Sequence, residues 1–170
     1  MTESHLSLKH CSDMTTKERS EAYHVLVTDP AFVDQTLATL ANDSEQQEVA
    51  SWFLKHHIDS GQTLHTTQIE DLCAALDQLE EWPAQLHILQ ILPQLELTGA
   101  VSDEVAEFAR HSLQADNKFV RAWSYAAFSH LALAHAEYKQ EVVSLLTAAL
   151  ENEAPSVRVR IRKALTDFDL

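Results

Sequence analysis

Hydrophobic residues recur every three or four positions along most of this chain, and short polar segments separate the runs. Such spacing places the apolar side chains on one face of an α-helix. It predicts nine helices of roughly 11 to 20 residues, joined by connections of roughly 2 to 6 residues. Residues 1–14 are polar and lack this periodicity. We therefore expect a loose N-terminal tail over 1–14 and a single helical domain over 15–170.

Local signals predict several helix ends. Thr15 with Glu18, and Thr67 with Glu70, have the spacing of a capping box, in which each side chain binds the backbone N–H of the other residue. Gly61 is typical of a residue that ends a helix in the left-handed conformation. The two boxes therefore predict helix starts, and Gly61 predicts a helix end.

Composition supports an all-α fold, because the chain contains only two Gly and four Pro and is rich in Leu, Ala, Glu and Gln. A chain of this length can bury a core without disulfides or metals. Pro93 lies inside one helical run, where it removes a backbone donor and crowds the preceding turn. We expect a kink or break near residues 89–92.

A longer period is superimposed on the helical one, because the segment DNKFVRAWSYAAF at 116–128 is echoed 37 residues later by EAPSVRVRIRKAL at 153–165. Hydrophobic character is retained in the pairs Val105/Val142, Phe108/Leu145, Ala109/Leu146, Leu113/Leu150, Val120/Val157, Ala127/Ala164, Phe128/Leu165 and Leu131/Phe168. One helical hairpin cannot bury both of its apolar faces, so repeated hairpins are expected to stack. Earlier copies are fainter, and they carry His87 and Ala50 where the clear copies carry Arg.

A Val-Arg pair shortly after an acidic turn residue resembles the HEAT and HEAT-like (armadillo-type) helical repeats. The resemblance covers residues 100–170 well and 42–99 loosely. It implies an all-α, right-handed α-α superhelix, that is, a solenoid of about four helical hairpins plus a terminal helix. In that family the Val packs between hairpins, while the Arg and the acidic residue tie neighbouring repeats together. The repeat-structural residues implied here are Asp116, Val120, Arg121, Glu153, Val157 and Arg158.

Charge narrows the range of partners. Twelve Lys and Arg face 26 Asp and Glu, which gives a formal net charge of −14. Such a field repels nucleic-acid backbones and anionic membranes, although net charge can also serve only to keep a protein soluble. The last helix is the exception, since it carries four cations for which the nearby Glu151 and Glu153 are the expected ion-pair partners. These cations are Arg158, Arg160, Arg162 and Lys163.

No catalytic, cofactor or metal site is predicted. The ten histidines include no pair at i and i+4, the spacing that would place two imidazoles on one helix face. The scarcity of Gly leaves no phosphate-binding loop or nucleophile elbow. Two isolated cysteines, and an N-terminus without an apolar segment, indicate a soluble, cytoplasmic protein without a membrane partner.

These observations favour a non-enzymatic protein–protein interaction or scaffold module. In solenoids of the resembled family the second helices line the concave side, so a carboxylate near the start of each predicts an acidic concave face for a basic peptide or protein. The expected partner-binding residues are Glu70, Asp71, Asp103, Glu104, Glu107 and Glu141, with Asp34 on the same set of helices. Two alternatives remain: a HEAT-like DNA-repair glycosylase-type enzyme, which requires a cationic cleft, and an acidic inhibitor or immunity protein acting on a basic partner.

Overall fold

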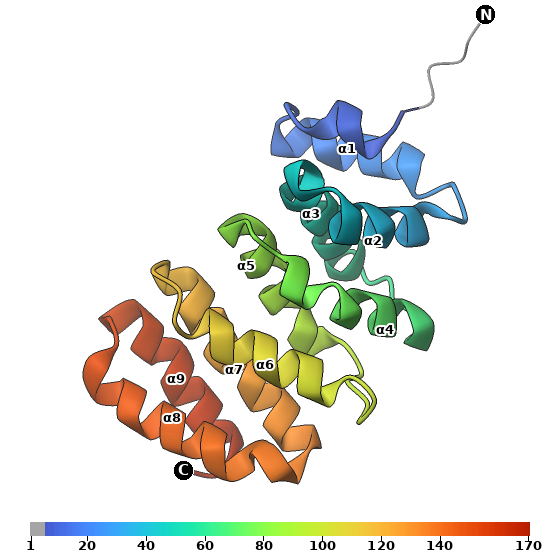
Figure 1. The fold of residues 1–170 in the computed structure, drawn as a ribbon. Helices are drawn as coiled ribbons and strands as arrows, with labels where there is room; N and C mark the ends of the chain where they lie inside the picture. Colours follow the sequence, from blue (N-terminus) through green and yellow to red (C-terminus); the bar gives the residue numbers. More distant parts are fainter. Residues whose placement is uncertain (1–5) are drawn as a thin grey trace, which may run out of the picture. The chain divides into compact units, whose positions relative to one another are not determined.

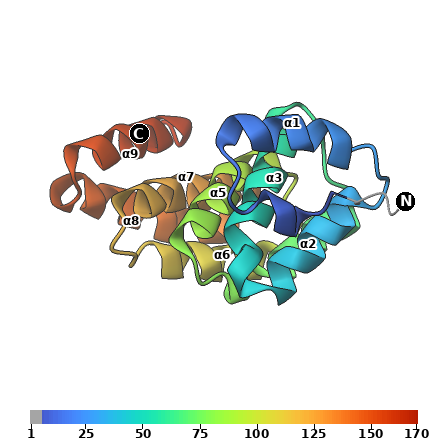
Figure 2. The same ribbon diagram turned by 90° about the horizontal axis from the view of Figure 1, so that it is seen from above.

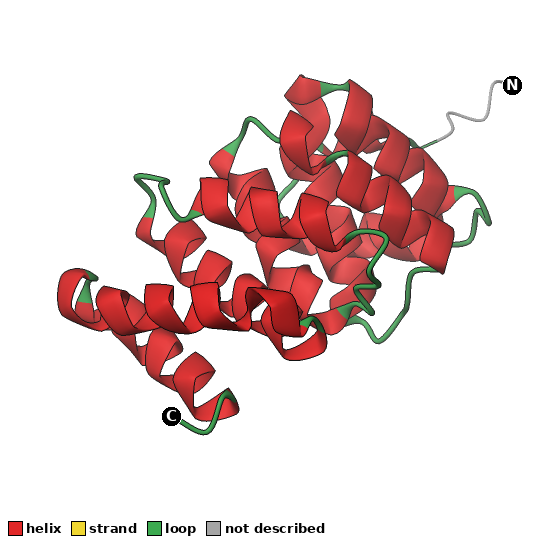
Figure 3. Cartoon of the chain, turned by 60° about the horizontal axis from the view of Figure 1, so that its bottom comes forward, coloured by secondary structure: helices red, strands yellow, loops and turns green. Residues whose placement is uncertain are grey.

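The computed structural model describes residues 6–170, and these residues form helices and loops without a strand (Figure 3). The predicted all-α class is therefore confirmed. The chain divides into two compact units, Met1–His87 and Ile88–Leu170. The boundary falls within α5 (Trp82–Ile91).

Unit 1 contains four complete α-helices and three short 3-10 helices. These are η1 (Leu8–Cys11), α1 (Thr16–Leu26), α2 (Phe32–Asn42), η2 (Ser44–Gln46), α3 (Gln47–Asp59), α4 (Thr66–Ala74) and η3 (Leu76–Gln78). Helices α2 and α3 pack against each other (Figure 2), and α4 also packs against α2. The apolar face of α3 supplies the centre of this unit, with Phe53 and Leu54 fully buried.

Unit 2 consists of two helical hairpins preceded by a 3-10 turn. Its elements are η4 (Leu92–Gln94), α6 (Ser102–Ser112), α7 (Lys118–Ala134), η5 (Ala136–Tyr138), α8 (Lys139–Asn152) and α9 (Pro155–Asp167). Helix α7 packs against α6, α8 and α9, and α8 packs against α9 (Figure 1). The core of this unit includes Phe128, Leu131, Leu146 and Ile161, each almost fully shielded from solvent.

The helices of unit 2 reproduce the 37-residue period of the sequence. Helices α6 and α8 begin at Ser102 and Lys139, and α7 and α9 begin at Lys118 and Pro155, so both starts are 37 residues apart. In unit 1 the starts of alternate helices are closer, because α1 and α3 begin 31 residues apart and α2 and α4 begin 34 apart. The repeat is therefore regular in unit 2 and shorter in unit 1, where the sequence signal is also fainter.

The N-terminal segment differs from the predicted loose tail. Residues 1–5 lie outside the described residues, but η1 follows directly and buries Leu8 and Cys11. Arg19 of α1 holds this segment in place, because its Nε and Nη2 donate to the carbonyls of Cys11 and Ser12. Leu8 and Cys11 are two apolar residues three positions apart in a single 3-10 turn. A segment this short does not show the periodicity that predicts an α-helix.

The sequence predicted some helix ends correctly and one incorrectly. The capping box of Thr15 and Glu18 is confirmed, and so is the left-handed Gly61, which has a φ of 84°. The box predicted at Thr67 is wrong, since α4 begins at Thr66 and the backbone N–H of His65 donates to Gln68 Oε1 at 2.9 Å. The earlier start adds two helical residues and still provides an acceptor for a free N–H.

Pro93 ends α5 as expected. The helix stops at Ile91, and residues 92–94 continue as η4 with Pro93 in its first positions. A proline ring cannot follow a regular α-helical turn without displacing the carbonyl four residues earlier, so the chain tightens into a 3-10 turn. The predicted break is therefore confirmed, and it brings Leu92 and Leu95 into the core of unit 2.

Candidate protein-binding surfaces

Two of the predicted acidic residues line one hollow in unit 1. Asp34 of α2 and Asp71 of α4 border a groove of about 320 Å³ whose apolar lining includes Ala38, Ala41 and Ala74. The Gln68 amide donates to Asp34 Oδ1 at 2.7 Å and fixes this carboxylate at the groove. Small side chains keep the hollow open between the two helices, so the carboxylates flank a shallow apolar floor. We call this feature the α2–α4 groove.

The carboxylate of Glu141 is engaged inside unit 2. Its two oxygens accept hydrogen bonds from Arg110 Nε and Nη2, both at 2.7 Å, which ties α8 to α6. Arg110 also pairs with Glu107 on its own helix. The guanidinium lowers the pKa of Glu141 below its ordinary value. The carboxylates of Glu107 and Glu141, which the sequence predicted to bind a partner, are therefore already paired with Arg110.

The other predicted residues fall into two groups. Asp103 accepts a hydrogen bond of 2.6 Å from the Tyr138 hydroxyl, so it too has an internal role. Glu70 and Glu104 are exposed on α4 and α6 and form no ion pair with a described residue, but neither lines the α2–α4 groove. Among the acidic residues predicted to bind a partner, Asp34 and Asp71 are the two that line the α2–α4 groove.

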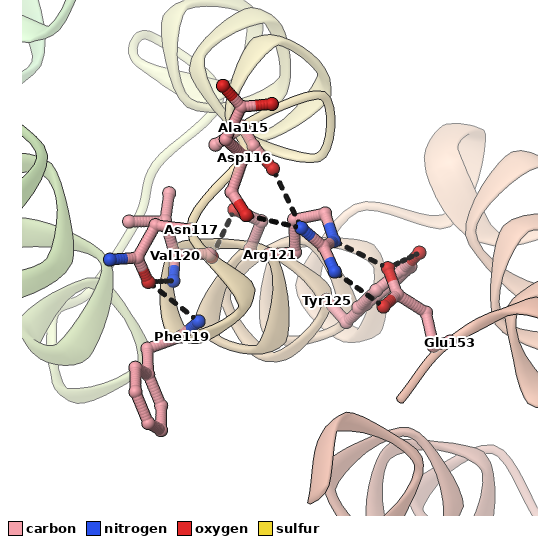
Figure 4. Close-up of polar contacts among 9 residues, drawn as sticks. Ala115, Asp116, Asn117, Phe119, Val120, Arg121, Tyr125 and Glu153 are labelled. Atoms are coloured by element: carbon pink, nitrogen blue, oxygen red, sulfur yellow. Dashed lines mark hydrogen bonds and ion pairs between the residues drawn. The ribbon is translucent and has the colours of Figure 1, made fainter. Parts of the chain in front are cut away.

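The repeat arginine of α7 forms the most connected polar cluster in unit 2 (Figure 4). Arg121 donates to both oxygens of Glu153, at 2.8 and 3.0 Å, and its Nη1 donates to the carbonyls of Ala115 and Asp116. It therefore joins the α6–α7 turn to the α8–α9 turn. Charge-assisted bidentate pairs of this kind are stronger and more directional than neutral hydrogen bonds. The guanidinium lowers the pKa of Glu153.

The remaining repeat-structural residues lie partly as the resemblance implied. Val120 and Val157 are buried at equivalent places in α7 and α9. Asp116 contributes its backbone carbonyl to the arginine cluster, whereas its side chain is exposed. Arg158 occupies the position of Arg121 one repeat later, but its buried Nε has no hydrogen-bond partner among residues 6–170.

The ion pairs expected for the last helix do not form. Glu153 binds Arg121 instead, and in the described part of the chain none of the cations of α9 lies within ion-pair distance of a carboxylate. The expectation that Glu151 and Glu153 pair with this helix is therefore wrong. Glu153 precedes α9, and its carboxylate accepts a hydrogen bond from Arg121 of α7.

Unit 1 contains an aromatic and histidine cluster that sequence reasoning missed. The Tyr23 hydroxyl and His57 Nδ1 share a hydrogen bond of 2.9 Å, and the His56 ring stacks on Trp52 with centroids 4.9 Å apart. Burial lowers the pKa of His57 below its ordinary value of 6.5 and raises the pKa of Tyr23. Neutral His57 is therefore part of the packed interior.

A buried arginine lies next to this cluster. Arg19 Nη1 and Nη2 donate to the two oxygens of Glu48 at 2.7 and 2.8 Å, joining α1 to α3. Ser51 and His87 share a further hydrogen bond of 2.9 Å between α3 and α5. Ser51 is fully buried, so this serine–histidine pair is not accessible to a substrate.

Side-chain hydrogen bonds between distant parts of the chain share one property in both units. Their partners are separated by about one repeat, from 28 residues for Tyr125 with Glu153 to 38 for His135 with Leu97. The pairs Tyr23–His57 and Gln68–Asp34 are both separated by 34 residues. This spacing is the signal that could have revealed the missed pairs, since a polar residue can be matched with one about a repeat later.

Residues 6–170 include no group of three or more His, Cys, Asp or Glu side chains placed to hold a metal ion. None of the helices they form is long and apolar enough to cross a bilayer. Comparison with known protein families, with curated proteins and with solved structures finds no match to this chain.

Proposed function

We propose that this protein is a non-enzymatic interaction module that binds a basic peptide segment of a partner protein through the α2–α4 groove. The observation that carries the proposal is the pairing of Asp34 and Asp71 across an open apolar floor. Two carboxylates with small side chains between them suit a Lys or Arg side chain, whose aliphatic stem packs on apolar surface while its charged end meets the acids.

The distribution of charge supports the same site. Unit 1 contains four Lys and Arg against fifteen Asp and Glu, a formal charge of −11, whereas unit 2 contains eight against eleven, a charge of −3. A cationic segment is therefore attracted to unit 1 more strongly than to unit 2. Complementary charge raises the association rate and disfavours anionic partners, and added salt weakens both effects.

The proposed architecture is a HEAT-like solenoid. Its supports are the 37-residue spacing of helix starts in unit 2 and the hydrogen bonds spaced by about one repeat in both units. In a solenoid each hairpin contacts its neighbours and little else, which leaves long helix faces available for partners. The α2–α4 groove lies between equivalent helices of successive hairpins, where such a protein offers a repeated surface.

A titration tests the proposed function. A fluorescently labelled decapeptide rich in Lys and Arg is mixed with the full-length protein at low salt, and anisotropy is recorded. We expect saturable binding that weakens as salt is added. Asp34→Asn combined with Asp71→Asn should reduce affinity about tenfold or more, because the segment loses both charge partners.

The matched control removes the same charge elsewhere in unit 1. Glu45→Gln with Glu80→Gln changes two exposed carboxylates that do not line the groove, and affinity should fall less than about twofold. Equal losses in the two double variants would show diffuse attraction rather than a site. If the free basic peptide does not bind, but an intact basic nuclease binds and loses its activity, the result would favour the acidic-inhibitor alternative.

A further inference from the structure

Unit 2 has a groove of opposite character between α7 and α9. It encloses about 190 Å³, and its lining includes Trp123 and His130 of α7 with Arg160, Lys163 and Asp167 of α9. The Arg160 guanidinium carbon lies 3.6 Å from the centre of the Trp123 ring. A guanidinium over an indole face is held by cation–π attraction, which leaves its N–H groups free to donate at the edges. We call this feature the α7–α9 groove.

The lining follows the repeat. Trp123 and Arg160 are 37 residues apart, and so are His130 and Asp167. Successive repeats therefore present the same helix face to this groove, but one supplies an aromatic platform and the other supplies the cation. The most deeply buried side chains of these two helices, for example Phe128 and Ile161, do not line the groove.

Arg160 is partly removed from solvent but has no anionic partner within the described part of the chain to offset its charge. Its side chain is partly buried, and among residues 6–170 no carboxylate lies within ion-pair distance of it. Burial accordingly lowers the pKa of Arg160. Asp167 borders the groove but forms no ion pair with Arg160 or Lys163. An anion that enters the groove would offset this unpaired charge.

The groove favours a carboxylate over a polyanion. Its titratable lining is Arg160, Lys163 and His130 against Asp167, so the local charge suits one negative group. A nucleic acid would also meet a chain whose net charge is −14. The exposed side chain of Leu133 at the groove gives apolar contact for the stem of a Glu side chain or a neighbouring apolar residue.

We propose that the α7–α9 groove binds a carboxylate of an acidic peptide segment, with Arg160, held over Trp123, as the anchoring donor and Lys163 beside it. This site does not depend on the α2–α4 groove, and the two would allow the protein to hold segments of opposite charge. Bidentate donation to both carboxylate oxygens is the geometry for which a guanidinium is suited.

The test uses the full-length protein and two peptides. An N-acetylated, C-amidated decapeptide with a single Glu among uncharged residues is titrated at low salt, and the indole N–H signals of the protein are followed by NMR. The matched peptide carries Gln in place of Glu. We expect saturable shifts of the Trp123 indole with the Glu peptide and an affinity at least about tenfold lower with the Gln peptide, because the anchoring charge is missing.

Variants on the same helix separate a site from general attraction. Arg160→Gln should weaken binding about tenfold or more, whereas Arg162→Gln, an exposed cation outside the groove lining, should weaken it less than about twofold. Arg160→Lys keeps the charge but loses the planar fork, so it should also weaken binding severalfold. Asp167→Asn should strengthen it, since a like charge leaves the groove.

Several results would overturn the proposal. They are equal weakening by Arg160→Gln and Arg162→Gln, equal affinity for the Glu and Gln peptides, or no binding of the Glu peptide at low salt. Tighter binding of a single-stranded oligonucleotide that shifts the same indole would assign the groove to another class of ligand. Circular dichroism and the unfolding midpoint verify that each variant is folded, and the Asp167→Asn result is informative even if Arg160→Gln fails to fold.

Discussion

Some arginines of the described chain form ion pairs with a glutamate, and others do not. Arg19, Arg110 and Arg121 each donate to both oxygens of a glutamate about one repeat away, so each joins one hairpin to the next. Arg158 and Arg160 form no ion pair with a described residue. The first group therefore holds helices together within each unit, and the second is available for other interactions. Identical residue types at repeat positions do not imply identical roles.

The two equivalent arginines of α7 and α9 give a matched stability test. Arg121→Met removes the donors to Glu153 and to two carbonyls. It leaves a glutamate side chain that is only 11% exposed without its cation and with Tyr125 as the remaining side-chain donor. We expect a loss of about 1–3 kcal/mol in unfolding free energy. Arg158→Met keeps the aliphatic stem and removes no hydrogen bond from the described residues, so its cost should stay below about 0.5 kcal/mol. Urea unfolding of both variants measures the difference.

Double substitution identifies the source of that loss. Arg121→Met with Glu153→Gln should cost less than the sum of the single changes, because the unpaired buried charge is removed together with its partner. Purely additive losses, or equal losses for Arg121→Met and Arg158→Met, would contradict the assigned role of Arg121.

Histidine burial predicts a pH dependence of stability. Burial lowers the pKa of His57 below its ordinary value of 6.5, and burial is also the largest cause of the lowered pKa of His56 and His87. Below about pH 6.5 the unfolded chain takes up protons that the folded chain does not, so unfolding becomes more favourable as pH falls. Around His56, Lys55 and His24 act in the same direction and Asp59 opposes them.

Urea unfolding between pH 7.5 and 5.5 measures this effect. Unfolding free energy should decrease across the range, and His57→Asn should show a shallower decrease despite its lower stability at neutral pH. An unchanged slope in His57→Asn would show that this histidine titrates alike in the folded and unfolded chain.

The end of α3 depends on the backbone conformation of a single glycine. After α3 the chain reverses at Gly61 in the left-handed conformation, and its N–H donates to the Ile58 carbonyl at 2.9 Å. The α5–α6 connection contains the other glycine, Gly99, which does not adopt a positive φ. Both positions have open space around an added Cβ, so only the backbone conformation distinguishes them.

Alanine at these two positions tests that distinction. Gly61→Ala should destabilise the protein by about 1–2 kcal/mol, because a Cβ disfavours the left-handed conformation. Gly99→Ala should be neutral or slightly stabilising, since it only restricts the unfolded chain. Thermal unfolding of the two variants gives the comparison, and a similar loss in both would rule out backbone conformation as the cause.

Element-level features were predictable to the extent that they depend on neighbouring residues. Helical periodicity located the nine α-helices of the described chain, and Pro93 located the end of α5, because both act within one or two turns. The start of α4 was misjudged, because N-cap preferences favour Thr67, whereas the helix begins at Thr66 and the His65 N–H donates to Gln68. Periodicity also failed for η1, which is too short to show it.

At the scale of the whole molecule, the sequence predicted acidity but not its location on the surface. Asp34 and Asp71 flank a groove, while Glu107 and Glu141 bind Arg110, and no local pattern separates these cases. Pairing depends on which side chains meet across hairpins, and this requires three-dimensional register. For the same reason the stacking of Arg160 on Trp123 was not predicted, although the two residues are 37 positions apart in the sequence.

If each hairpin packs mainly against its neighbours, parts of the chain should be able to unfold separately. Polar contacts between distant positions span about one repeat in both units, so stability is expected to depend mainly on contacts between adjacent hairpins. Ile161→Ala creates a cavity at a fully buried position of α9 and should cost about 2–5 kcal/mol locally. Native-state hydrogen exchange of the full chain should show faster exchange in α8 and α9, while the slowest amides of α3 keep their protection.

Val159→Ala provides the control on the same helix, because Val159 is 66% exposed and its truncation opens no cavity. Its exchange rates should match those of the parent protein. Equal loss of protection in α3 and α9 after Ile161→Ala would mean that the chain unfolds as one cooperative body, a behaviour that a row of hairpins stabilised by adjacent contacts does not predict.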